Sequence, residues 1–502
     1  MKLLTRIEQL GNRLPDPATL FVIGTIVVIG LSQLAVALDW SAANPATGTV
    51  RAQSLLTAEG LWWLISHLVE NFIRFPPLAI VLVGMLGIGL AELSGLLPVL
   101  LRFLIVRVPA PLLTPATVFL GIMSSLALDA GYVVLPPIAA ALYLAAGRSP
   151  LTGIAAVFAG VSAGFSANLL ITAVDPLLAG LTQAGAQIID PGYRVAVTAN
   201  WWFMIISTVL LTLTGWAVTA WFVEPRLNNT NVDNNSEPAL QAEQPNSMEI
   251  AGLRNASLIT VFLLIILILC TTLPGAPLHG EGVRFPRWVE ATVPLLFLLF
   301  FLPGVVYGMT ARTIRTDRDV ARMLGETMAR LGPYIVLAFF AAQFIETFNY
   351  SGLGKLLAIA GGQFLSDLQL PSSSLLGCFV MMVVTANLFI GSASAKYAFF
   401  APVFVPMLMQ VGISPELTQA AYRVGDSVSN VITPLNPYMI IILVLVQKYA
   451  RGSGLGTLIA IMLPYALVFL AVWTILLLSW VVLDIPLGPG GGLHYAAGFT
   501  LR

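Results

Sequence analysis

The 502-residue chain is poor in charged residues, cysteine and histidine. Charged residues make up 10% of it, against roughly 25% in soluble domains, which all but excludes a soluble enzyme. Lysine plus arginine and aspartate plus glutamate both total 24, so no net charge favours nucleic-acid binding. Cys270 and Cys378 lie in apolar runs, which excludes a disulfide framework and a thiolate metal cluster. No Walker motif is present, so ATP is excluded as the energy source.

Apolar residue types are abundant, at 58% of the chain, and predict a polytopic membrane protein. A spanning helix needs roughly 20 mostly apolar residues. Clean candidates are 18–38, 198–222, 256–273, 291–310, 330–350 and 456–483. Longer apolar stretches broken by Gly, Pro, Ser and Asn are 75–107, 111–186 and 374–447. The polar segment 223–254 predicts a cytoplasmic linker between a first half, 1–222, and a second half, 255–502.

Basic residues near span ends indicate the cytoplasmic side of the membrane. The strongest cluster is Arg312, Arg315, Arg318 and Arg322. Arg107 and Arg148 fall on the same side only if segment 111–146 enters and leaves the membrane there, and segment 374–411 must likewise return to the outer side. We therefore predict an all-α polytopic membrane protein with nine transmembrane helices plus two opposed re-entrant hairpins. The N-terminus is then cytoplasmic and the C-terminus periplasmic.

The two halves also share sequence patterns in the same order. Gly147-Arg-Ser-Pro150 corresponds to Gly412-Ile-Ser-Pro415, and Asn168–Pro176 corresponds to Asn430–Pro437. The predicted topology places Gly147 inside and Gly412 outside, so the two copies are inverted. An inverted repeat is typical of secondary transporters.

Each copy contains a predicted broken helix, within 150–186 and 415–447. Irregular backbone at membrane depth survives only inside protein or beside water. Its carbonyls can coordinate Na⁺, and half-helix N-termini can face an anion. We expect each half to form a site from a hairpin tip, at Ser124-Ser125 or Gly391–Ser394, and its broken helix. Helix packing is the simpler explanation for any single serine, but tip and break recur together in both halves.

Placing an Asp or Glu at mid-span costs roughly 2.5–3.5 kcal/mol. Burial also favours the protonated form of a carboxyl group, so the acids near the breaks are candidate proton carriers. These are Asp129, Asp175 and Asp426. Asp175 could instead cap a helix. Lys396 could pair with a neighbouring acid or reach toward water.

Arg423 precedes Asp426 by three residues on one helical face, so the two could form an ion pair. Arg423 could equally bind a carboxylate or sulfonyl group of the substrate. The sequence favours neither alternative. Glu92 and Glu346 are interpreted as interhelical hydrogen-bonding groups outside the site.

The string Gly160-Val-Ser162-Ala-Gly164 satisfies a nucleophilic-serine pattern. Such a serine needs a base, but His279 and His494 fall in a loop and the tail, and His67 lies on a predicted interfacial helix. An intramembrane hydrolase is therefore a weak alternative. An ion channel using the same re-entrant loops is another.

Several long strings resemble the AbgT family of membrane transporters. They are Gly11–Phe21, Asp129–Val134, Ala159–Leu170, Asp175–Gly180, Asn387–Lys396, Thr418–Ser427 and Asn430–Pro434. The resemblance implies a homodimer in a bacterial inner membrane, each chain with nine transmembrane helices and two opposed hairpins. It also implies import of p-aminobenzoyl-glutamate or proton-driven export of sulfonamide antimetabolites. The family usually has Trp where this chain has Tyr397, which keeps a stacking face beside Arg423.

Patterns and resemblance together predict an ion-gradient-coupled secondary transporter, not an enzyme, with H⁺ or Na⁺ as coupling ion and no cofactor. Its partners are a small-molecule substrate, the bilayer and a second copy, with no nucleic acid. The predicted substrate-binding residues are Asn387, Ser392, Ser394, Tyr397, Arg423, Asp426 and Pro434. The predicted ion-coupling residues are Ser124, Ser125, Asp129, Asn168, Asp175, Asn430 and Thr433, with Na⁺ possible at Ser125, Asn168, Ser394 and Asn430.

Overall fold

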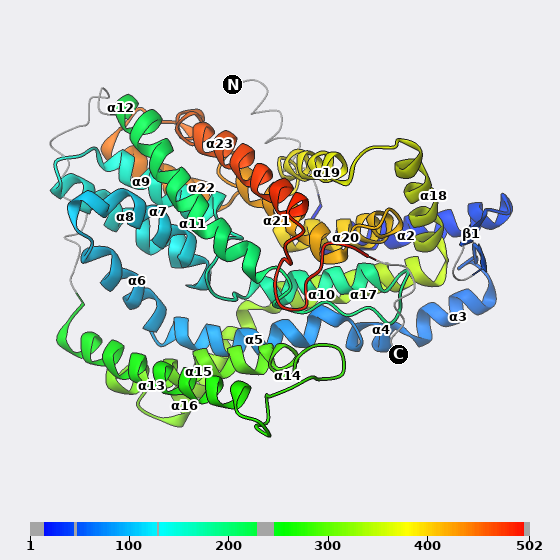
Figure 1. The fold of residues 1–502 in the computed structure, drawn as a ribbon, viewed down its shortest axis with the longest axis horizontal. Helices are drawn as coiled ribbons and strands as arrows, with labels where there is room; N and C mark the ends of the chain where they lie inside the picture. The colour runs from blue at the N-terminus through cyan, green and yellow to red at the C-terminus, as the bar shows by residue number, and fades with distance from the viewer. Residues whose placement is uncertain (1–14, 45–47, 128–129, 228–244, 496–502) are drawn as a thin grey trace.

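The computed structural model describes residues 15–44, 48–127, 130–227 and 245–495. Asp129, the first residues of the opening motif and linker residues 228–244 lie outside this part of the chain. Helices dominate what is described (Figure 1). The prediction of an all-helical chain missed one small antiparallel hairpin, formed by β1 (Ser41–Asn44) and β2 (Gly48–Arg51).

Among the described residues, six helices are long and apolar enough to cross a membrane. Five are single helices: α2 (Pro17–Ala37), α5 (Pro76–Leu93), α13 (Ser247–Thr272), α15 (Thr292–Thr310) and α23 (Leu455–Val482). The sixth is a continuous run made of α11 (Trp201–Val218), η4 (Thr219–Val223) and α12 (Glu224–Leu227). The predicted span 330–350 is α17 (Gly332–Tyr350), which bends by 46° against the amphipathic α16 (Asp317–Arg330). Each apolar run predicted from the sequence therefore coincides with a helix.

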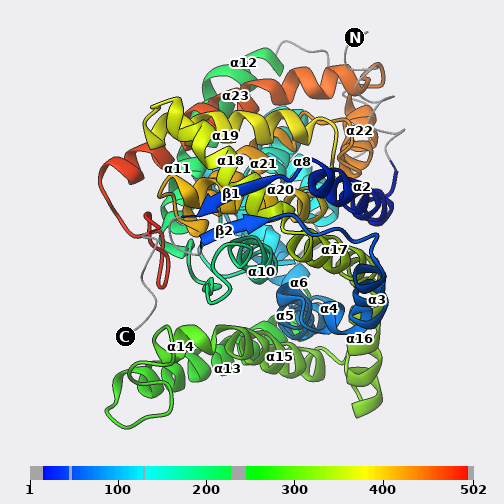
Figure 2. The same cartoon turned by 90° about the vertical axis from the view of Figure 1, so that its right-hand side faces the viewer.

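A scaffold layer lies along one side of the molecule. Helix α15 packs on α5 and α13, and α16 packs on α5. Figures 1 and 2 show α13 and α15 at the lower edge, away from the hairpins and broken helices. The short helices α3 (Ala58–Ser66), α4 (Leu68–Ile73) and α14 (Arg287–Glu290) lie between or beside the long ones. Within the described part of the chain most of α13 is exposed, since 11% of its apolar window is buried.

The first hairpin follows α6 (Leu96–Val106) and η1 (Ala110–Leu112), where the chain turns by 117°. It consists of α7 (Leu113–Met123), η2 (Ser124–Ala127) and α8 (Ala130–Ala145). Its arms of 11 and 16 residues are shorter than the roughly 20 residues that a span requires. Thr114 near its start accepts hydrogen bonds from Tyr143 (2.9 Å) and Arg148 (2.8 Å) near its end. Both ends therefore lie on one side, as a re-entrant segment requires.

The second hairpin and both broken helices complete the core. The hairpin is α19 (Ser372–Asn387) and α20 (Ala393–Gln410), preceded by α18 (Leu353–Asp367). The first broken helix is α9 (Pro150–Phe158), the π-helical turn η3 (Ala159–Ala163) and α10 (Val174–Ala186), and the second is α21 (Pro415–Ser429) and α22 (Tyr438–Tyr449). Helix α8 packs on α9 and α22, and α20 packs on α10 and α21. Each hairpin thus touches both broken helices, which interlocks the two repeats.

Matched turns support the repeat at the level of backbone geometry. Gly95 and Gly352 adopt φ values of 95° and 71° immediately before α6 and α18. Glycine suits this left-handed conformation because it has no Cβ. Each follows a buried serine, Ser94 or Ser351, whose hydroxyl donates to the carbonyl three residues earlier. The same turn therefore recurs at the same place in each half.

The repeats are inverted, as predicted. Gly147 and Gly412 both adopt positive φ, 70° and 82°, shortly before α9 and α21, which each begin with proline. The Gly147 turn is next to the Arg148–Glu224 ion pair (2.7 Å), whereas the Gly412 turn is bonded to the C-terminal segment at Tyr495 (2.9 Å). Corresponding turns thus lie against different parts of the molecule.

The glycine-rich C-terminal segment after α23 is packed against the start of α11. Thr198 donates to the carbonyl of Pro489 (2.7 Å). A Cβ on Gly491 would lie 1.9 Å from the carbonyl oxygen of Ala199, whereas a Cβ on Gly492 meets nothing within 4 Å. The segment therefore approaches α11 too closely for any side chain at Gly491.

We expect Gly491→Ala to lower stability by about 1–3 kcal/mol, because the added methyl must displace backbone. The adjacent Gly492→Ala is the matched control and should leave stability unchanged. Thermal unfolding of both variants in detergent micelles would check this. Equal midpoints for the two variants would show that the segment is not packed against α11 in solution.

Candidate transport site

In the first half, the hairpin tip contacts the broken helix directly. Asn168 lies in the break between η3 and α10, and its amide donates to the Ser125 hydroxyl at 2.7 Å. Both side chains are buried. The hairpin tip and the broken helix of the first half therefore meet, and Ser125 and Asn168 bring neutral oxygens close together. Ser124 is also buried but donates to Gly121 in its own helix (2.7 Å).

In the second half, Asn387 at the end of α19 makes the corresponding contact. Its amide nitrogen lies 2.8 Å from the Asn430 side-chain oxygen, 2.8 Å from the Ser429 hydroxyl and 2.9 Å from the Asp426 carbonyl. Asn430 is the repeat counterpart of Asn168. In each half, an asparagine of the break thus contacts the hairpin of the same half, through Ser125 or Asn387.

The two breaks also contact each other. The Ser427 hydroxyl accepts from the backbone amide of Ser166 at 3.2 Å, and Asn436 donates to the Ser162 hydroxyl at 3.1 Å and to the carbonyl of Asn430 at 2.9 Å. Polar groups freed by the interruptions are therefore satisfied partly by the opposite repeat and partly within the same break. Irregular backbone at membrane depth needs such partners.

Arg423 does not pair with Asp426 on its own helix. Its guanidinium contacts Asp175 of the first broken helix at 2.7 Å, 248 residues away in sequence. The second carboxylate oxygen of Asp175 accepts from the backbone amide (2.6 Å) and hydroxyl (2.9 Å) of Thr172, which precedes α10. Asp175 therefore does not cap the helix, whose N-cap residue is Ala173. The same-helix ion pair was the wrong prediction, because the docked repeats bring a better-placed acid to Arg423.

Asp426 instead pairs with Lys396 of the second hairpin at 2.6 Å. The Lys396 ammonium also donates to the side-chain oxygen of Asn387, and Tyr422 donates to Asp426 at 3.2 Å. Lys396 and Asp426 are both fully buried. Lys396 therefore pairs with a neighbouring acid and does not reach toward water. Its ammonium group lies among oxygen atoms that could also coordinate a free cation.

Thr182 of α10 links the second hairpin to α21. Its hydroxyl lies 2.7 Å from the Tyr397 hydroxyl and 2.9 Å from the side-chain oxygen of Gln419. Tyr397 and Gln419 are fully enclosed. Tyr397, predicted as a stacking surface for substrate, is thus occupied by neighbours, with Tyr422 at 4.2 Å between ring centroids.

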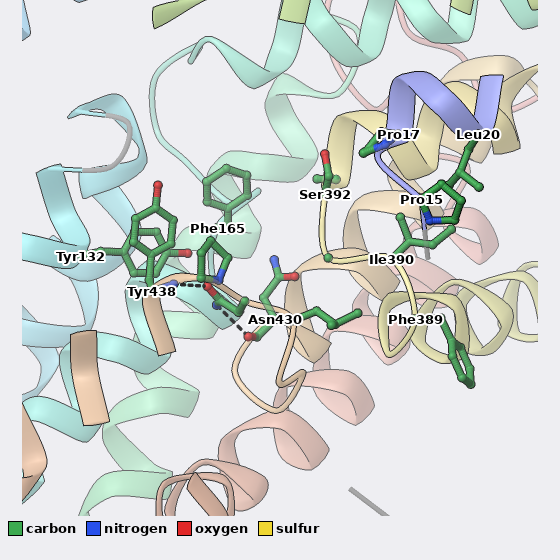
Figure 3. A pocket seen from close by; sticks show the side chains of 15 residues that line it. Pro15, Pro17, Leu20, Tyr132, Phe165, Phe389, Ile390, Ser392, Asn430 and Tyr438 are labelled. Atoms are coloured by element: carbon green, nitrogen blue, oxygen red, sulfur yellow. Dashed lines mark hydrogen bonds between the residues drawn. The ribbon is translucent and has the colours of Figure 1, made fainter. Parts of the chain in front are cut away.

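A cavity of about 560 Å³ lies beside these groups (Figure 3). Tyr132 and Tyr438 stack in it with ring centroids 4.1 Å apart and an interplanar angle of 8°. Asn430 and Ser392 lie across from the ring pair. The buried ion pairs do not line this cavity, so in this conformation they are separated from it.

The remaining predicted residues are dispersed. Ser392 caps α20 (3.3 Å to the backbone amide of Ala395) and lies 3.3 Å from the Ser394 hydroxyl. Ser394 does not bond to Asn430, so the second proposed Na⁺ pair is not assembled here. Thr433 is buried, and Pro434 lies in the same break.

The sequence analysis did not predict the Tyr132–Tyr438 stack, although Tyr132 lies in the string Asp129–Val134 and Tyr438 directly follows the second break. It also left out Thr182, because nothing in an apolar helix marks which threonine meets the other repeat.

The two other predicted acids have local structural partners. Glu92 contacts Arg330 of α16 at 3.3 Å, so it links two helices as predicted. Glu346 lines a separate polar cavity of about 590 Å³ near α4.

The hydrolase alternative is wrong. Ser162 accepts a hydrogen bond from Asn436. The histidines are bonded elsewhere: His67 to Ser66 (2.9 Å), His279 to the carbonyl of Thr271 (2.9 Å) and His494 to Asp484 (3.2 Å). The serine pattern is explained by close packing of the breaks.

Inverted repeats, opposed hairpins and two broken helices beside a cavity are typical of a secondary transporter. The model of the AbgT putative transporter family matches residues 2–495, and the chain belongs to this family of transporters. The family resemblance noted in the sequence is thereby confirmed, and neither the hydrolase nor the channel alternative is retained.

Individual relatives match over nearly their whole length. The p-aminobenzoyl-glutamate transport protein of Escherichia coli (strain K12) is 36% identical over 498 residues, which cover 97% of this chain and 96% of that protein. The solved structure of the Alcanivorax borkumensis YdaH transporter is 45% identical with a TM-score of 0.90, covering 95% of this chain and 100% of that one. Neisseria gonorrhoeae MtrF is 42% identical with a TM-score of 0.92, covering 97% and 100%.

Proposed function

We propose that this chain is an ion-coupled secondary transporter of p-aminobenzoyl-glutamate-like aromatic acids and of sulfonamide antimetabolites. The relatives support both substrate classes, since one is a p-aminobenzoyl-glutamate transport protein and MtrF illustrates a class of antimetabolite efflux pumps. The observation that carries the proposal is the cavity where stacked Tyr132 and Tyr438 lie opposite Asn430. Aromatic faces suit an aniline ring, and amides suit its polar substituents.

The buried ion pairs supply a second element of the proposal. Arg423 is the natural bidentate partner of a substrate carboxylate or sulfonyl group, and its Nε is buried without a hydrogen-bond partner among the described residues. We infer that substrate reaches Arg423 when its pair with Asp175 opens. The first half, 1–222, and the second, 255–502, would then carry their hairpins and broken helices against the scaffold during alternating access.

The coupling ion is proposed to be H⁺ or Na⁺. Protonation of Asp175 or Asp426 would remove the charge that holds Arg423 or Lys396. Na⁺ would use neutral oxygens such as those of Ser125 and Asn168. No protein cofactor is part of this proposal.

Sealed vesicles containing the purified protein would test the function. Uptake and efflux of labelled p-aminobenzoyl-glutamate and of a sulfonamide would be measured with Na⁺ and pH gradients imposed separately. Gradient-dependent movement of either compound, absent from empty vesicles, is expected. Failure of both compounds to move under either gradient would refute the proposal.

Tyr438→Ala should weaken substrate binding, because it removes one ring of the stacked pair. The expected loss is about 0.5–1.5 kcal/mol, or roughly 2- to 12-fold in apparent affinity. Tyr132→Phe retains the ring and serves as the control, with affinity near that of the unaltered protein. Competition for uptake by unlabelled p-aminobenzoyl-glutamate measures both. Unchanged affinity in Tyr438→Ala would place the substrate elsewhere.

We also propose that the protein lies in an inner membrane as a homodimer, with its N-terminus in the cytoplasm and its C-terminus in the periplasm. The arginines of α16 and the preceding turn support the orientation. The exposed apolar face of α13 leaves room for lipid or a second copy. The mass of the detergent-solubilised particle by light scattering tests the dimer.

A further inference from the structure

Helix α21 is buried at every position and yet has a polar face. Glu416, Gln419, Arg423 and Asp426 recur at spacings of three and four residues, which places them along one side of the helix. Arg423 and Asp426 have their ion-pair partners, and Gln419 bonds to Thr182. Glu416, at the opposite end of this face from the break, belongs to neither ion pair.

Glu416 is 2% exposed, and its carboxyl group is held by a hydroxyl rather than by a cation. The hydroxyl of Tyr193 lies 2.9 Å and 3.1 Å from its two oxygens. Among the described residues no basic side chain forms an ion pair with it. This contrasts with Asp175 and Asp426, which each have a cationic partner.

The ionisable groups around Glu416 come from each neighbouring element. The loop after α10 contributes Tyr193 with Asp190 behind it, α20 contributes Tyr397, and the C-terminal segment contributes Tyr495. Helices α19 and α23 contain no Asp, Glu, Lys, Arg or His. The carboxyl group of Glu416 therefore has two hydroxyl partners, Tyr193 and Ser414, and the described residues include no cation paired with it.

Counting charges along the buried face shows an imbalance. Glu416, Asp175 and Asp426 are three acids, whereas Arg423 and Lys396 are two bases. An uncompensated buried charge is strongly unfavourable. A single proton on Glu416 would make the whole set neutral, and its loss would leave one net negative charge on the same helix as Arg423.

The position of Glu416 gives it a route to solution on one side of the protein. It lies in the first turn of α21, where Ser414 bonds to the C-terminal segment at Gly492 (2.7 Å) and Leu493 (3.0 Å). Tyr193, which contacts Glu416, is only partly buried and meets Tyr495 edge-on at 5.9 Å. By the proposed topology this is the outer side.

We propose that Glu416 is a proton-binding site of the transport cycle, reached from the outer side through Tyr193. The proton forms an O–H bond with one carboxylate oxygen of Glu416. The Tyr193 hydroxyl then forms a hydrogen bond with a neutral carboxylic acid in place of a carboxylate. The change of charge on α21 alters how tightly Arg423 is held by Asp175, which couples proton uptake to substrate release or capture. This inference rests on the proposed ion-coupled transport and identifies the proton site within it.

The test uses Glu416→Gln in sealed vesicles with a labelled sulfonamide. Glutamine keeps the shape and an acceptor for Tyr193 but cannot bind the proton. We expect loss of accumulation driven by a pH gradient, with retained exchange of labelled for unlabelled substrate at equal pH on both sides. Glu346→Gln, a partly buried glutamate on α17, is the matched control and should retain both activities.

The outcomes separate this inference from the proposed function. If the unaltered protein moves no substrate, the proposed function fails. If it does and Glu416→Gln still accumulates substrate under a pH gradient as the unaltered protein does, Glu416 is not the proton site and this inference fails alone.

A second variant keeps the inference testable if Glu416→Gln does not fold. Tyr193→Phe removes the hydrogen bond that favours the ionised carboxylate, so the pH of half-maximal proton-driven transport should move upward by about half to one pH unit. An unchanged pH profile in a folded Tyr193→Phe protein would overturn the proposal. So would substrate accumulation that responds to a Na⁺ gradient and not to a pH gradient.

Discussion

Arg423→Gln is expected to abolish gradient-driven transport and to destabilise the protein by about 3–5 kcal/mol, because it leaves Asp175 buried without its cation. Asp175 and Arg423 are 2.7 Å apart and belong to different repeats, so their pair joins the two broken helices. Thermal unfolding in detergent and substrate flux in vesicles measure the two effects separately.

The double variant Arg423→Gln with Asp175→Asn is the control for that experiment. Replacing both partners removes the uncompensated charge, so most of the lost stability should return. Transport should not return, because the cation that we propose to bind the substrate is still missing. Normal flux in the single or double variant would show that the pair only supports the structure.

Lys396→Met is expected to make stability depend on Na⁺. The ammonium of Lys396 lies 2.6 Å from Asp426 and also contacts the side-chain oxygen of Asn387. Methionine has a similar length but no charge, so at low Na⁺ the buried Asp426 should cost about 3–5 kcal/mol. Added Na⁺ can enter the vacated oxygen site and should restore much of this loss, because hard cations favour oxygen ligands.

Two variants control for this effect. Lys355→Met, on α18, changes a lysine that forms none of these contacts and should show no Na⁺ dependence. Lys396→Met combined with Asp426→Asn removes the carboxylate and should be insensitive to Na⁺ as well. A stability of Lys396→Met that is the same with and without Na⁺ would show that the oxygens around Lys396 cannot hold a cation.

The two buried ion pairs, Arg423 with Asp175 and Lys396 with Asp426, have a consequence for the transport cycle. The cavity beside Tyr132 and Tyr438 is accessible, whereas Arg423 and Lys396 are enclosed and held by their acids. A ligand can change this state only if it binds the opened state more tightly than the closed one. The proposed binding of substrate at Arg423 and of a proton at a buried acid would both meet this condition, since each would replace an interaction of the ion pair.

Much of the architecture followed from local features of the chain. The apolar runs coincide with helices, the Gly147 and Gly412 turns recur, and the basic residues at 107 and 148 required a hairpin between them. That a hairpin tip lies beside the broken helix of its own half was also predicted, because tip and break recur together in the repeat. These features depend on residue type, spacing and charge near a span end, which the sequence carries directly.

Partner choice across the interface of the repeats was decided only by the tertiary structure. Arg423 pairs with Asp175 rather than with Asp426 three residues away, and Tyr132 stacks on Tyr438 of the other half. Which of several polar groups meet depends on how the interlocked helices are rotated and docked, and helical periodicity does not contain that information. The sequence by itself therefore determined the spans, the hairpins and the inverted repeat. The docking of the repeats determined the ion pairs and the cavity, because buried charges settle on whichever partner the packing brings within reach.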